Sequence, residues 1–159
     1  MRITNKLRDY ETGLESIISA GLDCGVNVKF LLPIRNPIDC VRSNIKTGHY
    51  RHLTKETSSE AIFSAVVNEL RFFHEISEKF PSSTLLIREQ EFGKHLLCHL
   101  ADRLVISRDE TWLEQASKLF VIRARSQTSE DVEIYQTVVR RICSDRPDIR
   151  ETLLNLSPN

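Results

Sequence analysis

The chain has 159 residues, a length suited to one compact domain rather than two. Its 22 Lys and Arg residues balance its 22 Asp and Glu residues, and a net charge of zero argues against a dedicated nucleic-acid-binding protein, which carries a basic excess. No segment approaches the roughly 20 apolar residues of a membrane span, and the polar start of the chain is unlike a signal peptide. Four cysteines without a C-x-x-C pair favour buried free thiols in a reducing compartment. We therefore expect one cytoplasmic domain over residues 1–159.

Apolar residues at spacings of three and four predict helices, and short apolar runs predict strands. In chain order we expect a helix over residues 5–20, a strand over 28–34, helices over 37–47 and 60–79, a strand over 84–88, and helices over about 93–104, 111–118 and 130–143. Residues 119–122 fit either a short strand or a continued helix. This order predicts an α/β domain with parallel strands.

The first strand runs directly into a helix. Its nearly unbroken apolar run suits a strand covered on both faces, and Pro33, which lacks an N–H donor, is expected near the strand end or on an irregular edge. Asn36 is a good helix cap, Pro37 suits the first helical position, and Gly48 is the natural stop.

The turn between this strand and helix is the best candidate for a ligand site, because ligands of open α/β sheets bind at the carboxyl ends of strands. Arg35 stands there, next to the free N–H groups and positive dipole end of the following helix, and its guanidinium can hold two phosphate oxygens. On that helix Ser43 falls about 140° from the buried side at Ile38, so its hydroxyl is expected to reach an anion held by Arg35. An exposed arginine beside an ordinary capped helix is an equally weighted alternative.

The charge around this turn is locally basic although the whole chain is neutral. Between residues 35 and 55 there are five basic residues and a single acid, Asp39. His49 and His52 lie in the same segment and are the nearest candidates for a catalytic base, although exposed loop histidines are the favoured interpretation. A different pair, His95 and His99, has the spacing of a zinc-binding helix, but no third ligand stands out, so no metal site is predicted.

The segment 30–43, FLLPIRNPIDCVRS, resembles the 3′-phosphate-binding motif of sulfotransferases, enzymes that use 3′-phosphoadenosine 5′-phosphosulfate as donor. In that family an apolar strand ends in Arg-(Asp/Asn)-Pro, and a serine follows eight residues after the arginine. The resemblance implies that Arg35 and Ser43 contact the 3′-phosphate of the donor, with Asn36 and Arg42 as weaker candidates.

The resemblance continues along the chain from Val28 onward. Residues 85–92 are similar to the family's later strand, with its Tyr and Asp replaced, and residues 119–126 with the helix that contains Tyr135 resemble a late arginine-rich segment, which implies weaker donor contacts from Arg123 and Arg125. The implied fold is a P-loop-like, three-layer α/β domain, rich in helix, with a short parallel sheet flanked by helices.

One family element has no counterpart, the glycine- and hydroxyl-rich loop that binds the 5′-phosphosulfate. We expect either that this loop precedes Met1, so that the chain is the C-terminal portion of a sulfotransferase-like domain that is incomplete at its N-terminus, or that the chain is a reduced relative. The expected activity is sulfuryl transfer from 3′-phosphoadenosine 5′-phosphosulfate to an unidentified small-molecule or glycan acceptor. The alternatives are a non-catalytic nucleotide- or anion-binding module and a helix-rich interaction module.

Overall fold

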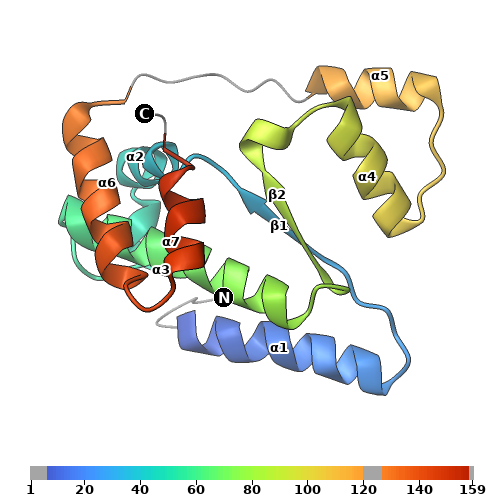
Figure 1. Cartoon of the computed structure of the whole chain (residues 1–159), viewed down its shortest axis with the longest axis horizontal. Coiled ribbons are helices and arrows are strands. Elements are labelled where there is room, and N and C mark those ends of the chain that lie inside the picture. Colours follow the sequence, from blue (N-terminus) through green and yellow to red (C-terminus); the bar gives the residue numbers. More distant parts are fainter. Residues whose placement is uncertain (1–6, 120–126, 158–159) are drawn as a thin grey trace.

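Helices flank a small parallel sheet in the computed structural model of the chain (Figure 1), which describes residues 7–119 and 127–157, with side chains from residue 13 onward. The elements in chain order are α1 (Leu7–Asp23), β1 (Phe30–Ile34), α2 (Pro37–Thr47), the 3-10 helix η1 (His49–His52), α3 (Ser59–Lys79), β2 (Thr84–Arg88), the 3-10 helix η2 (Glu89–Glu91), α4 (Lys94–Leu104), α5 (Glu110–Leu119), α6 (Ser129–Ile142) and α7 (Pro147–Leu154).

The two strands pair in parallel, with Phe30 opposite Thr84 and Ile34 opposite Arg88. The connection between them carries the long helix α3, as parallel pairing requires a crossover. The expected helix-rich α/β arrangement with a short parallel sheet flanked by helices is therefore confirmed.

The prediction that β1 is covered on both faces is wrong. Leu32 and Ile34 are buried, whereas Leu31 and Pro33 are exposed, so the side chains alternate between a covered and an open face. The backbone explains how Pro33 is accommodated. Because the Phe30 N–H donates to the Ser83 carbonyl, the amide positions of Leu31 and Pro33 face away from β2, and the missing N–H of Pro33 removes no bond of the ladder.

The main core lies where α2, α3, α6 and α7 meet, on the same side of the sheet in Figure 1. Phe63 of α3 and Tyr135 of α6 are fully buried there, with ring centroids 6.3 Å apart. The helix α7 was not among the expected elements, although Pro147 at its first turn is a helix-start signal. A second apolar cluster joins α1 to α3 and β1.

The first helix continues past Gly21, where the sequence pattern predicted its end. A Cβ on Gly21 would lie 2.5 Å from Val28 Cγ2 and 3.2 Å from the Val26 carbonyl oxygen. The glycine therefore lets the returning chain pack against the helix, and the reversal itself occurs at Gly25, with a φ of 69°.

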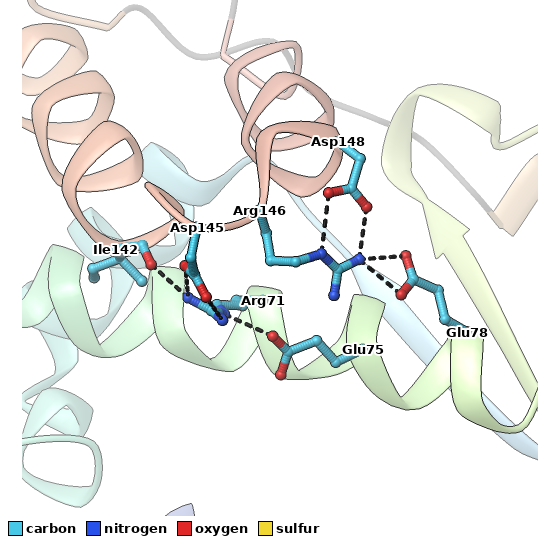
Figure 2. A network of polar contacts seen from close by, with 7 residues as sticks. All are labelled: Arg71, Glu75, Glu78, Ile142, Asp145, Arg146 and Asp148. Atoms are coloured by element: carbon cyan, nitrogen blue, oxygen red, sulfur yellow. Dashed lines mark hydrogen bonds and ion pairs between the residues drawn. The ribbon is translucent and has the colours of Figure 1, made fainter.

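A network of ion pairs fastens α3 to the turn between α6 and α7 (Figure 2). Arg71 of α3 binds both carboxylate oxygens of Asp145, at 2.7 and 2.8 Å, and also the Ile142 carbonyl oxygen. Arg146 binds Asp148 and reaches back to Glu78 on α3, with its Nη2 2.8 Å from a carboxylate oxygen of that residue. Arg71 and Arg146 are thus both paired with acids of neighbouring elements.

All four cysteines are free, but only Cys143 is buried and Cys24 is exposed, so the expectation of buried thiols fails for Cys24. Among residues 7–119 and 127–157, no helix is both long and apolar enough to cross a lipid bilayer.

Candidate anion-binding site

Arg35 lies at the carboxyl end of β1, two residues before the first residue of α2. It is exposed and lines a cavity of about 280 Å³ between β1, α2 and α3. Within the part of the chain that the structure describes, its guanidinium makes no hydrogen bond or ion pair. The order strand, arginine, helix that the sequence predicted is therefore confirmed, and the arginine has donors to offer a ligand.

The N–H groups at the start of α2, by contrast, are not free. The Asn36 side-chain oxygen accepts from the N–H groups of Ile38 and Asp39, at 3.0 and 3.3 Å. The N–H of Asn36 donates to Glu89 Oε2 at 2.8 Å. The prediction of free donors at this helix start is wrong, because Asn36 caps the helix and Glu89 follows β2 at the same edge of the sheet.

Asn36 acts as the predicted helix cap, and this role engages its side chain. Its Oδ1 caps α2, and its Nδ2 donates to the Leu156 carbonyl oxygen at 3.4 Å. A contact between Asn36 and a nucleotide remains a prediction, and it competes with both of these bonds.

Arg42 forms an ion pair with a residue of helix α6. Its Nε and Nη2 lie 2.8 and 2.5 Å from Asp131 Oδ2, in the first turn of α6. This pair joins α2 to α6 and offsets part of the basic excess read from residues 35–55. A role for Arg42 in ligand binding stays a prediction.

Ser43 is half-buried on α2. At 100° per residue, it falls within an arc of about 100° that also holds Cys40 and Asn44. These two residues line the same cavity as Arg35. Ser43 itself is not among the residues that line this cavity, so its contact with an anion held by Arg35 stays a prediction.

Two acidic side chains from other elements lie near this turn: Glu69 lines the cavity, and Glu89 accepts from the Asn36 N–H. Burial raises the Cys40 pKa; the Arg35 guanidinium lowers it, while Glu89 and Glu69 raise it further. Burial also raises the pKa of Glu69, which lines the cavity from α3. The turn that is basic in sequence is therefore surrounded by carboxylates in space.

Sequence reasoning missed Glu69 and Glu89. Glu89 follows the second predicted strand directly, and since parallel strands end at one edge of a sheet, its position was a usable signal. Glu69 is one polar position within a long amphipathic helix, and no local pattern distinguishes it.

The other predicted residues lie elsewhere or outside the described ranges. Arg123 and Arg125 fall within 120–126, which the structure does not describe. His49 and His52 are exposed on η1, with ring centroids 6.2 Å apart, and do not line the cavity at Arg35. Within the described ranges there is no group of three or more His, Cys, Asp or Glu residues arranged to hold a metal.

No protein-family model, curated protein or solved structure matches this chain.

Proposed function

We propose that the chain is a sulfotransferase-like protein with a P-loop-like fold, and that it carries the half of the donor site that binds the 3′-phosphate of 3′-phosphoadenosine 5′-phosphosulfate. The observation that supports this proposal is the guanidinium of Arg35, which has no hydrogen-bond or ion-pair partner among the described residues and lies at the carboxyl end of a parallel strand, beside the helix that carries Ser43. A phosphate matches the fork of an arginine, and a hydroxyl on the following helix can add a further hydrogen bond to it.

In this function Arg35 and Ser43 bind and orient the donor. Sulfuryl transfer breaks the bond between sulfur and the bridging oxygen of the leaving nucleotide, at the 5′ end, and the acceptor is a small molecule or a glycan that loses a proton to a base. A contact to the 3′-phosphate holds and orients the donor but does not touch the bond that breaks. Substitutions at Arg35 are therefore expected to change the affinity for the donor more than the rate of the chemical step.

A non-catalytic anion-binding module is the second candidate, and one observation favours it. The backbone donors that commonly surround a bound phosphate are here occupied by Asn36 and Glu89. Such a module would hold an adenosine bisphosphate weakly and transfer nothing.

Calorimetric titration with adenosine 3′,5′-bisphosphate tests the binding proposal. We expect a dissociation constant of roughly 10–1000 μM, loss of measurable binding in Arg35→Ala, and a weakening of about tenfold in Ser43→Ala, as for a hydrogen bond to a charged group. Arg51→Ala is the matched control, because Arg51 is also an exposed arginine but lies on η1, against the Tyr50 ring. Absence of binding in a folded wild-type chain, or equal loss in Arg51→Ala, contradicts the proposal.

Release of adenosine 3′,5′-bisphosphate from the intact donor, in the presence of a panel of phenols, alcohols, amines and sugars, separates the two candidates. The sulfotransferase assignment predicts acceptor-dependent release that Arg35→Ala reduces. Binding without release supports the non-catalytic module.

A further inference from the structure

The cavity at Arg35 has apolar walls and two charged groups. Val66, Leu70 and Phe73 of α3 form one side of it, and prolines of β1 and α2 form the other. Its volume, about 280 Å³, lies near the lower end of the range for ligand sites and suits a small molecule.

The two charged groups of the cavity, Arg35 and Glu69, are not paired with each other. Glu69 is half-buried, and within the described chain it makes no hydrogen bond or ion pair. Both residues line the same cavity as Cys40 of α2. Glu69 lies partly withdrawn from water on an otherwise apolar wall, where burial raises the pKa of its carboxyl, so a cationic ligand group in the cavity would favour its ionised form.

The polar atoms of the cavity define what that partner offers. Asn44 Nδ2 donates to the Cys40 carbonyl oxygen at 2.9 Å, which leaves the Asn44 side-chain oxygen as an acceptor in a cavity that Glu69 also lines. Two acceptors match an amine. Arg35 matches a carboxylate, and the walls match an apolar side group.

We propose that this cavity binds a small zwitterion, an amine and a carboxylate beside an apolar side group, as in a free apolar amino acid. The amine lies on Glu69 and Asn44, and the carboxylate lies on Arg35. This inference does not depend on the nucleotide proposal. It uses Arg35 together with a residue, Glu69, that the nucleotide proposal does not involve.

A matched set of three probes tests the site by calorimetry on the full chain. Leucine carries both charged groups, 3-methylbutylamine lacks the carboxylate, and 4-methylpentanoate lacks the amine. We expect leucine to bind, and each single-charge analogue to bind at least tenfold more weakly.

Two variants then assign the contacts. Glu69→Gln is expected to weaken the binding of leucine and of 3-methylbutylamine at least tenfold. It is expected to leave the binding of 4-methylpentanoate unchanged. Arg35→Gln is expected to weaken the binding of leucine and of 4-methylpentanoate and to leave the binding of 3-methylbutylamine unchanged. Glu75→Gln, on the same helix but paired with Arg71, is the control and is expected to change none of the three.

Circular dichroism and thermal unfolding of each variant separate lost binding from lost folding. Absence of leucine binding to the folded wild-type chain overturns the inference, as does leucine binding that Glu69→Gln leaves intact. Leucine binding that depends on both residues, in a chain that does not bind adenosine 3′,5′-bisphosphate, supports this inference and removes the nucleotide proposal. Binding of adenosine 3′,5′-bisphosphate by a folded chain that does not bind leucine removes this inference and leaves the nucleotide proposal in place.

Discussion

The carboxylate of Glu89 accepts a hydrogen bond from the backbone N–H of Asn36, with 2.8 Å between nitrogen and oxygen. This bond ties the carboxyl ends of β2 and β1 together. It also places a negative charge at the N-terminal end of α2, where the helix dipole favours an anion by about 0.3–1 kcal/mol. Glu89 thus occupies, from within the chain, a position at which a bound anion would otherwise find a donor.

Glu89→Gln is expected to tighten the binding of adenosine 3′,5′-bisphosphate by about two- to fivefold, because it removes a like charge near the phosphate while it keeps an acceptor for Asn36. The unfolding free energy, measured by urea denaturation, is expected to fall by about 0.3–1 kcal/mol because the interaction of the carboxylate with the helix dipole is lost. Glu91→Gln, two residues further on and paired with Arg88, is the control. Weaker nucleotide binding in Glu89→Gln would show that the carboxylate does not compete with the ligand.

The hydroxyl of Tyr135 fastens α6 to α7, because it donates to the Leu153 carbonyl oxygen at 2.6 Å within the core. Tyr135→Phe is expected to lower the unfolding free energy by about 1 kcal/mol at pH 7, since it removes one buried hydrogen bond and leaves the Leu153 carbonyl oxygen with the Leu156 N–H as its donor. Urea denaturation followed by circular dichroism measures this change.

Alkaline pH provides an independent check of the same residue. Burial raises the pKa of Tyr135 above its ordinary value of 10.0. Above that pH the unfolded chain loses the phenol proton while the folded chain keeps it. The unfolding free energy of the wild type is therefore about 1.4 kcal/mol lower at pH 11 than at neutral pH because of this one group. The difference between wild type and Tyr135→Phe is therefore expected to vanish near pH 11. A difference that stays constant from pH 8 to pH 11 would contradict the burial of the hydroxyl.

Acid stability is expected to depend on the ion pairs drawn in Figure 2. The hydrogen bond from Arg146 lowers the pKa of Asp148 to about 2, from an ordinary value of 3.8. A lowered pKa means that the stabilisation is complete above about pH 4 and is lost as the pH falls toward 2. Asp148→Asn is expected to lower the Tm at pH 5 and to flatten its decline between pH 4 and pH 2. The exposed Asp23→Asn is the control, and a decline equally steep in Asp148→Asn would contradict the assignment.

The helix α4 ends on a residue that is poorly suited to its backbone. Val105 has a φ of 56° and is 92% exposed, so its β-branched side chain makes the left-handed conformation costly without gaining burial. Val105→Gly is expected to raise the unfolding free energy by about 0.5–1 kcal/mol. Val105→Ala, which keeps the Cβ, is expected to change it much less. A destabilised Val105→Gly protein would show that the valine side chain contributes packing that its exposure does not suggest.

Local sequence patterns were sufficient for most of the elements. Helices and strands with clear periodicity were predicted close to their bounds, and the stops and caps at Asn36, Pro37 and Gly48 were identified from residue chemistry alone. These signals are short-range, because a cap or a stop is decided by the few residues that form it.

The wrong predictions about β1 and about the end of α1 concern features that depend on neighbours distant in sequence. We expected both faces of β1 to be buried, but an apolar run does not show whether other elements pack on one face of a strand or on both. Gly21 does not end helix α1; the absence of a side chain there leaves the space into which Val28 of the returning chain packs.

The sequence by itself determined the α/β class and the position of Arg35 at the junction of strand and helix, because periodicity and capping are local. Only the tertiary structure decided the electrostatic character of that junction. It brings Glu69, Glu89 and Asp131 from three other elements to a segment that contains a single acid of its own. Charges act through space, so a basic excess counted along the chain changes once folding places acids beside it.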